Sequence, residues 1–219
     1  MGDTSPPIWR WVGDRALLRE FPGDDLAHRN ESARALYGRI CELRLAEVED
    51  VVPAAASVLV LLRTGTEPPP DLMSALETAE PTAGAAVARA PRAHQIEVAY
   101  GGEAGPDLAD FARLHGLDER AAVELHSSIH YTVGFLGFSP GFAYLIGLPA
   151  ALATPRLATP RTRVPAGSVA VGGEFTGVYP RATPGGWWIL GRTDVSLFDP
   201  HVDPPTRLLP GERVKFVPL

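Results

Sequence analysis

The sequence predicts an α+β protein in which a small α/β domain precedes a closed or nearly closed β-barrel. Helix-like and strand-like segments alternate through residues 1–80, which is typical of a compact α/β unit. Residues 81–93 are rich in alanine and punctuated by proline and glycine, a composition that suits a linker. Beyond Ile129, short β-prone runs alternate with Gly/Pro turns, as a barrel requires. The expected domains are therefore residues 1–80 and 94–219.

The N-terminal domain is expected to have a ferredoxin-like arrangement. A Gly13-Asp14 turn between two short apolar runs favours a hairpin, and Asp24 or Asp25 can cap a helix. The expected elements are strands at Ile8–Val12 and Ala16–Phe21, a helix to Leu43, strands at Val48–Val52 and Ser57–Arg63, and a helix from Pro68–Pro70 to Glu80. Strands and helices interleaved in this way are typical of a ferredoxin-like plait.

The barrel domain is expected to begin with one strand and two short helices. The strand is His94–Tyr100, and the helices are Asp107–His115 and Asp118–Ser127. The later β-prone runs are Tyr131–Leu136, Ser168–Val171, Gly177–Tyr179, Trp187–Leu190 and Val214–Val217. Glycines between these runs permit tight corners, and their Val, Trp and Phe side chains supply the interior.

Composition argues against several classes of function. The net charge of -6 at pH 7 is unlike that of a general nucleic-acid binder, which normally carries a basic stripe. The longest apolar run, Val51 to Leu62, is interrupted by Pro53 and is too short for a membrane span. The single cysteine, Cys41, excludes an internal disulfide and fits a reducing cytoplasm, so we expect a cytoplasmic protein. Its helical spacing predicts a small core residue rather than a catalytic thiol.

Standard catalytic signatures are missing from the sequence. It contains no phosphate-binding GxxxxGK[ST] loop, no GxGxxG, no HExxH and no GxSxG. The motif GFSPG at 137–141 resembles a nucleophile elbow only superficially, because Pro140 follows the serine. His126 and His130 are four residues apart, but the helix is expected to end near Ser127, which favours a packed histidine over a metal ligand. We therefore expect no metal site in this chain.

An acid-free stretch containing arginines is the most informative feature. No Asp or Glu occurs between Glu124 and Glu174. Arginines within and just after this stretch are Arg156, Arg161, Arg163, Arg181 and Arg192. Arginine presents a planar fork that suits carboxylate or phosphate. In proline-braced loops without neutralising acids, these side chains predict a site for a small anion or an acidic partner. The alternative is that they are simply solvated.

Backbone N–H groups beside glycine offer a second way to hold an anion. The turn at Gly167-Ser168 and the pair Gly185-Gly186 bring main chain close to a ligand, although barrel corners need glycine as well. Ser168 could act as a nucleophile, but no histidine is near it in the sequence to activate it. These backbone donors therefore strengthen the prediction of an anion site that rests on the arginines, but they do not identify a reaction.

Two further features allow both a functional and a structural interpretation. Asp199, which precedes Pro200, could be a general base, although a turn-forming role is favoured. The aromatic residues Phe138, Phe142 and Tyr144 could line a pocket, but residues of this type and spacing more often belong to the core.

Several stretches of the C-terminal half carry a resemblance to a known family. They are YGGEAGPDL (100–108), GFSPGFAYLIGLP (137–149), PRLATPRTRVPAGSVAVGG (155–173), TGVYPRATPGGWWILGRT (176–193) and LFDP (197–200). In this order they resemble the family of KipI and the 5-oxoprolinase B-subunit (PxpB), also known as allophanate hydrolase subunit 1, or carboxyltransferase domain, subdomains C and D. The N-terminal part resembles that family less by motif than by length and arrangement.

The resemblance implies a fold, partners and an activity. The fold is a small α/β domain followed by a cyclophilin-like β-barrel, and the partners are subunit 2 (the KipA-like C-subunit of 5-oxoprolinase) and the A-subunit. The activity is ATP-dependent opening of 5-oxoproline to glutamate, with ATP and Mg²⁺ bound by the complex and not necessarily by this chain. Two alternatives stay open: subunit 1 of an allophanate hydrolase or urea carboxylase-type enzyme, and a KipI-like inhibitor of a sensor histidine kinase.

Within the motifs of this resemblance, residue chemistry assigns a candidate site for a small anionic substrate. The candidate catalytic residues are Arg161, Arg163, Arg192 and Ser168. The candidate substrate-binding residues are Gly167, Gly185, Gly186, Phe142 and Tyr144. The arginines are expected to supply positive charge, and the glycines are expected to supply backbone donors at a developing oxyanion.

Overall fold

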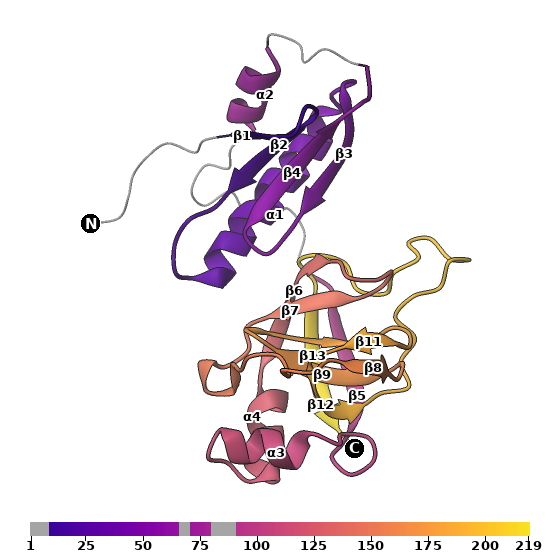
Figure 1. Cartoon of the computed structure of the whole chain (residues 1–219). Coiled ribbons are helices and arrows are strands. Elements are labelled where there is room, and N and C mark those ends of the chain that lie inside the picture. The colour runs from indigo at the N-terminus through magenta and orange to yellow at the C-terminus, as the bar shows by residue number, and fades with distance from the viewer. Residues whose placement is uncertain (1–8, 66–70, 80–90) are drawn as a thin grey trace. The chain divides into compact units, whose positions relative to one another are not determined.

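The computed structural model describes residues 9–65, 71–79 and 91–219, and the chain divides into two compact units, residues 1–90 and 91–219 (Figure 1). Of the predicted elements, Ile8, the prolines at 68–70, Glu80 and most of the linker at 81–93 lie outside the described residues. The first strand of the second unit begins at Ala93, which is the last residue of the predicted linker.

The N-terminal unit is a four-stranded antiparallel sheet with helices. Its elements are β1 (Arg10–Val12), β2 (Ala16–Glu20), α1 (Leu26–Leu43), β3 (Val48–Pro53), β4 (Ser57–Leu62) and α2 (Leu72–Thr78). The sheet order is β1-β2-β4-β3, so β4 lies between β2 and β3 and is antiparallel to both. This arrangement is the split βαβ unit of ferredoxin-like folds. The outer strand beside β2 is β1, which precedes the unit in the chain.

Helix α1 packs its apolar face on one face of the sheet (Figure 1). The Asp25 side chain caps this helix by accepting hydrogen bonds from the backbone N–H groups of Ala27 and His28, as the sequence predicts. Ala33, Leu36 and Ile40 are buried, whereas Leu43, the last residue of the helix, is 44% exposed.

The prediction that Cys41 is a core residue is wrong. Cys41 is exposed, although the residue before it, Ile40, is buried in the core of the unit. Successive residues of an α-helix are separated by about 100° around the helix axis. Cys41 is therefore rotated out of the stripe formed by Leu36 and Ile40.

The second unit is a closed seven-stranded barrel with two short helices and a separate two-stranded ribbon. Its first elements are β5 (Ala93–Tyr100), α3 (Leu108–Leu114), α4 (Glu119–Ser128), β6 (His130–Leu136), β7 (Ala143–Ile146) and a 3-10 turn (Ala150–Leu152). Its later strands are β8 (Arg161–Val164), β9 (Ser168–Gly172), β10 (Phe175–Val178), β11 (Thr183–Gly185), β12 (Trp188–Arg192) and β13 (Arg213–Pro218). The α+β class and the closed barrel are confirmed.

Around the barrel the strand order is β10-β7-β6-β13-β5-β12-β9, and β9 pairs with β10 to close it. The pair β5–β13 is parallel, and the other barrel pairs are antiparallel. Helices α3 and α4 pack together at one end of the barrel (Figure 1). Strands β8 and β11 form the ribbon outside the closed barrel.

Strand β8 was not predicted, and its assignment corrects the expectation that Arg161 and Arg163 lie in loops. Three of its four residues are polar, with only Val164 fully buried. A short strand of this composition lacks the apolar alternation by which strands are predicted. Pairing with β11, in which Gly185 lies opposite Arg161, makes this segment extended.

The barrel interior contains one fully buried histidine, His126, at the end of α4. Its Nε2 lies 2.9 Å from Thr176 Oγ1, and its Nδ1 lies 2.8 Å from the Tyr100 hydroxyl. Because Thr176 donates its hydroxyl proton to Ala170 O, Nε2 of His126 is the donor and Nδ1 accepts from Tyr100. Burial lowers the pKa of His126 to about 3. The interpretation of His126 as a packed histidine is confirmed.

Among residues 9–65, 71–79 and 91–219, no helix is long and apolar enough to cross a membrane. The same residues contain no group of three or more His, Cys, Asp or Glu side chains placed to hold a metal ion.

Candidate functional site

Arg161 forms an ion pair with Asp107, a residue 54 positions earlier in the chain. Arg161 Nη2 donates to Asp107 Oδ1 at 2.5 Å, and the two side chains are 31% and 11% exposed. Asp107 Oδ2 accepts a hydrogen bond from the backbone N–H of Ile189 at 2.7 Å. The acid-free stretch of the sequence therefore does receive a neutralising carboxylate, which comes from the start of α3 and not from neighbouring sequence.

The second terminal nitrogen of Arg161, Nη1, is buried and has no hydrogen-bond partner among the residues that the structure describes. Buried polar atoms in folded proteins are nearly always paired, so an unpaired guanidinium nitrogen indicates a group that a ligand or water completes. A guanidinium fork is suited to a carboxylate or phosphoryl oxygen. Arg161 is thus the predicted arginine whose surroundings best fit an anion-binding role.

Tyr179 places a phenol hydroxyl near two arginines. Burial raises the pKa of Tyr179 above its ordinary value, while a hydrogen bond from the backbone of Trp187 and the positive charges of Arg156 and Arg161 oppose this increase. The tyrosine is almost fully buried, and a Cβ atom at Gly185 would overlap its hydroxyl. Gly185 is therefore needed to leave room for Tyr179, opposite Arg161 in the β8–β11 ribbon.

An aromatic cluster surrounds Tyr179. Phe142 packs edge-to-face on Tyr179 at 5.3 Å and on Trp187 at 5.4 Å between ring centroids. Phe138 contacts both Phe142 and Tyr179, yet it is 59% exposed and has a positive φ of 62°. Tyr144 is half-buried; burial raises its pKa, and the nearby charge of Arg156 opposes this. Of the predicted pocket residues, Phe142 is core, and Tyr144 lies at the partly open edge.

The other predicted arginines lie elsewhere. Arg163 and Arg192 are exposed and make no ion pair within the described part of the chain. Arg192 lines a cavity of about 380 Å³ together with Glu97 and Asp194, and this cavity includes neither Arg161 nor Arg163. The structure therefore separates Arg192 from the Arg161 pair.

Gly167 and Ser168 have structural roles at a corner of the barrel. Gly167 has a positive φ of 80°, and a Cβ there would overlap the backbone oxygen of Thr193. Its N–H donates to Tyr179 O at 2.8 Å, so this N–H is not free to stabilise an oxyanion. Ser168 is buried, and none of the hydrogen bonds in the described residues joins its hydroxyl to a histidine.

Gly186, the second residue of the glycine pair, accepts a hydrogen bond at its carbonyl oxygen from the backbone N–H of Leu157 at 2.7 Å. This bond ties the segment before β8 to the loop that follows β11. Gly186 therefore supports the shape of the ribbon that carries Arg161.

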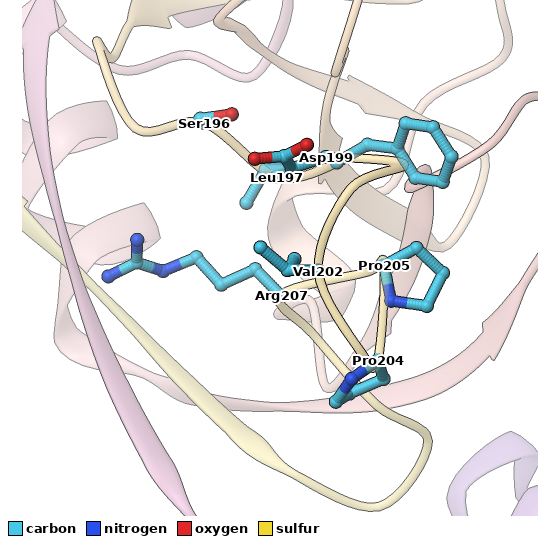
Figure 2. Close-up of a pocket in the computed structure, with 8 residues that line it drawn as sticks. Ser196, Leu197, Asp199, Val202, Pro204, Pro205 and Arg207 are labelled. Atoms are coloured by element: carbon cyan, nitrogen blue, oxygen red, sulfur yellow. The ribbon is translucent and has the colours of Figure 1, made fainter.

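Asp199 forms a turn, as favoured from the sequence. Its Oδ1 accepts a hydrogen bond from the backbone N–H of His201 at 2.9 Å, the pattern of an Asx-turn. The segment 196–207 surrounds a cavity of about 290 Å³, lined in part by Asp199 and Arg207 (Figure 2). No hydrogen bond in the described residues links Asp199 to a histidine or serine side chain.

Sequence reasoning missed two residues of the site, Asp107 and Tyr179. Asp107 was interpreted only as a helix start, and Tyr179 only as part of a β-prone run. Both lie within motifs that carry the family resemblance, YGGEAGPDL and TGVYPRATPGG. The presence of a polar residue inside a family motif is the sequence signal for both of them. The residue with which each one interacts cannot be deduced from sequence spacing.

The fold and site define a two-unit α+β protein whose barrel carries an arginine–carboxylate pair beside an aromatic cluster. The chain belongs to the family described as carboxyltransferase domain, subdomain C and D, which matches residues 7–208. This match extends over both units.

Individual relatives agree with this assignment. The chain is 49% identical over 210 residues to the 5-oxoprolinase B-subunit of Escherichia coli O157:H7, covering 94% of each chain. It resembles the crystal structure of TTHA0988 with a TM-score of 0.80 and 34% identity, over 94% of this chain and 40% of that longer chain. The urea carboxylase of Kluyveromyces lactis is similar with a TM-score of 0.74 over 100% of this chain and 22% of that chain. Its identity of 18% shows a shared fold alone.

Proposed function

We propose that this chain is the B-subunit of a 5-oxoprolinase, a component of an ATP-dependent hydrolase that opens the cyclic amide of 5-oxoproline to give glutamate. The observation that carries this proposal is the 49% identity to a 5-oxoprolinase B-subunit over 94% of both chains. Because the similarity includes the N-terminal unit as well as the barrel, it supports a common role for the whole chain.

The Arg161 site offers chemistry that such a reaction needs. 5-Oxoproline carries a carboxylate, and opening its amide develops negative charge on the amide oxygen. Arg161 has an unpaired guanidinium nitrogen, and Arg156 adds a second positive charge near the Tyr179 hydroxyl. We assign Arg161 to binding an anionic oxygen, with Tyr179 as a neighbouring hydrogen-bonding group.

ATP, when bound to the complex, would supply the phosphoryl group that activates the amide oxygen. The sequence has no phosphate-binding loop, and the residues described here include no carboxylate cluster for Mg²⁺. These residues do not fit a complete Mg²⁺–ATP site. In this proposal the partner subunits hold the nucleotide, and this chain supplies positive charge beside the substrate.

The partners in this proposal are the KipA-like C-subunit and the A-subunit of the enzyme, all in the cytoplasm. Two findings support a heteromer. The word "subunit" in the name of the Escherichia coli relative describes that protein as part of a larger enzyme. In TTHA0988, a region like this chain forms 40% of one longer polypeptide. The activity is expected only when the three proteins are combined.

Reconstitution tests the proposal. The chain is mixed with the A-subunit and C-subunit proteins of the same genome, and glutamate release from 5-oxoproline is measured with and without ATP. We expect release to require ATP and all three proteins. Omitting this chain is the control. Absence of glutamate from the full mixture, together with turnover of allophanate, would instead favour the urea-related alternative.

A further inference from the structure

We propose that Asp107 is a positioning residue for substrate binding, which holds the guanidinium of Arg161 so that one nitrogen remains available for an anionic oxygen. This inference rests on the proposed function, because it names the group that prepares the Arg161 site. Asp107 itself does not contact the substrate and acts through Arg161.

Asp107 is held in place from two directions. Its backbone N–H donates to Ile189 O at 3.1 Å, and its carboxylate Oδ2 accepts from the Ile189 N–H at 2.7 Å. Its own carbonyl oxygen accepts from the Phe111 N–H at 2.8 Å in the first turn of α3. Backbone and side chain of Asp107 are therefore both attached to fixed elements, β12 and α3. A carboxylate fixed in this way sets the direction of the arginine that binds it.

In the ion pair between Asp107 and Arg161, a single carboxylate oxygen accepts from a single guanidinium nitrogen. Arginine–carboxylate pairs are frequently bidentate, with two parallel hydrogen bonds. Here Oδ1 of Asp107 accepts from Arg161 through Nη2, while Oδ2 accepts from the Ile189 N–H and lies on the side of the β12 backbone. Arg161 Nη1 is buried and has no acceptor among the described residues. Leaving a buried donor unpaired is unfavourable, and a ligand oxygen that accepts from it recovers this loss.

A second carboxylate on the same helix provides a comparison. Asp110 pairs with Arg113 at 2.7 Å, but both side chains are largely exposed, at 65% and 76%. Exposed pairs of this kind contribute little to stability and organise no site. Asp110 is therefore a matched control for Asp107, since it is an aspartate of α3 that is ion-paired to an arginine but distant from Arg161 in the hydrogen-bond network.

The ligand group is an oxyanion of carboxylate or phosphoryl type. Both present oxygens to a guanidinium in the geometry that Arg161 offers. The positive charges of Arg156 and Arg161 both act on the Tyr179 hydroxyl, which adds a hydrogen-bonding group to this region. In the proposed enzyme the oxyanion is either the carboxylate of 5-oxoproline or a phosphoryl oxygen of ATP. Separate measurements for the two ligands distinguish them.

The test compares Asp107→Asn with Asp110→Asn in the assembled enzyme. We expect Asp107→Asn to raise KM for one of the two ligands by about 10- to 100-fold, with a smaller change in kcat, because a charge-assisted contact becomes misdirected. Asp110→Asn should leave both KM values unchanged. Adding Asp107→Asn to an Arg161→Lys variant should cause little further loss, because both changes remove the same contact.

Binding of 5-oxoproline to the same assembly, measured by calorimetry without turnover, separates this inference from the proposed function. If the unmodified assembly binds 5-oxoproline more tightly than the Asp107→Asn assembly but releases no glutamate, the positioning role stands and the proposed function fails. If glutamate is released and both KM values and binding are unchanged by Asp107→Asn, the positioning role is overturned.

Folding is controlled separately. If Asp107→Asn prevents assembly, Asp107→Glu replaces it, because a longer carboxylate keeps the charge while moving Arg161. A lowered melting temperature with unchanged KM values in either variant identifies a purely structural ion pair and overturns the proposal. An increase in KM for 5-oxoproline alone assigns the substrate carboxylate, and an increase for ATP alone assigns a phosphoryl oxygen.

Discussion

His126 and Arg161 are two polar groups of the barrel unit that differ in how completely their hydrogen bonds are satisfied. The ring of His126 has a partner at each nitrogen, Tyr100 and Thr176, and its carbonyl oxygen accepts from the Tyr131 hydroxyl. Arg161 has a carboxylate partner at Nη2 and none at Nη1 within the described residues. A satisfied network stabilises one structure, whereas a buried donor without a partner is costly unless water or a ligand supplies an acceptor. Variants of His126 should therefore change the free energy of unfolding, whereas variants of Arg161 should change the activity of the enzyme.

The largest expected effect is on stability and comes from His126→Ala. The change leaves a cavity in a fully buried position and removes the partners of Tyr100 and Thr176. We expect the free energy of unfolding to fall by about 3 to 5 kcal/mol, measured by urea denaturation. His130→Ala, at an exposed position, is the control and should change it by less than about 0.5 kcal/mol. Equal effects of the two variants would show that the buried hydrogen bonds of His126 do not stabilise the fold.

The next effect is on activity and comes from Arg161→Lys. Lysine keeps the positive charge beside Asp107 but lacks the planar fork, so the second contact to an oxyanion is lost. We expect kcat/KM of the reconstituted enzyme to fall about 100-fold, with the free energy of unfolding changed by less than about 1 kcal/mol. Arg163→Lys, on the same strand but exposed, should retain activity within about threefold. If Arg163→Lys is the more damaging variant, the site has been placed on the wrong arginine.

A smaller effect is expected where the two glycines of the GGWW motif are compared. A Cβ at Gly185 overlaps the Tyr179 hydroxyl, whereas at Gly186 the nearest atom is Leu157 O at 3.6 Å, an ordinary contact. We expect Gly185→Ala to lower the free energy of unfolding by about 1 to 3 kcal/mol and to disturb Tyr179. Gly186→Ala should be within about 1 kcal/mol of the unchanged protein by the same denaturation assay. If Gly186→Ala lowers the free energy of unfolding more than Gly185→Ala does, Tyr179 moves away from the added Cβ without cost.

The smallest effect within the working pH range concerns protonation of His126. Burial lowers the pKa of His126 in the folded state to about 3, below its ordinary value near 6.5. At pH values between these two pKa values, the unfolded chain therefore binds more protons than the folded protein. His126 consequently contributes to the free energy of unfolding above pH 6.5, and this contribution is lost as the pH falls. Between pH 7 and pH 5.5 this loss is about 1 kcal/mol. Comparing denaturation of the unchanged protein and His126→Gln at both pH values measures it, and identical pH dependence would exclude a neutral buried His126.

Several parts of the fold were predictable because their signals are local. The Asp25 cap and the buried positions Ala33, Leu36 and Ile40 identify α1 from capping chemistry and helical spacing. Turns rich in glycine and proline identify the barrel half. Strand β8 and the exposure of Cys41 were not predicted, because they depend on pairing with β11 and on the exact rotation of α1 against the sheet.

The candidate site was predictable only in part. Arg161 stood out as an arginine within an acid-free stretch, and it does lie beside other polar groups. Arg192, which follows this stretch in the sequence, was grouped with Arg161 but lines another cavity, with Glu97 and Asp194. Residue type alone did not separate these two arginines, because the difference between them is the presence of a buried carboxylate on a neighbouring element.

The sequence by itself determined the α+β class, the barrel half and the motifs of the family, since these follow from periodicity, turn residues and composition within short segments. Only the tertiary structure decided that Asp107 reaches Arg161 across 54 residues and leaves Nη1 without a partner among the described residues. That contact depends on β12 holding Asp107 and on the β8–β11 ribbon holding Arg161. Such long-range placement arises from strand order and register, which no short segment of sequence contains.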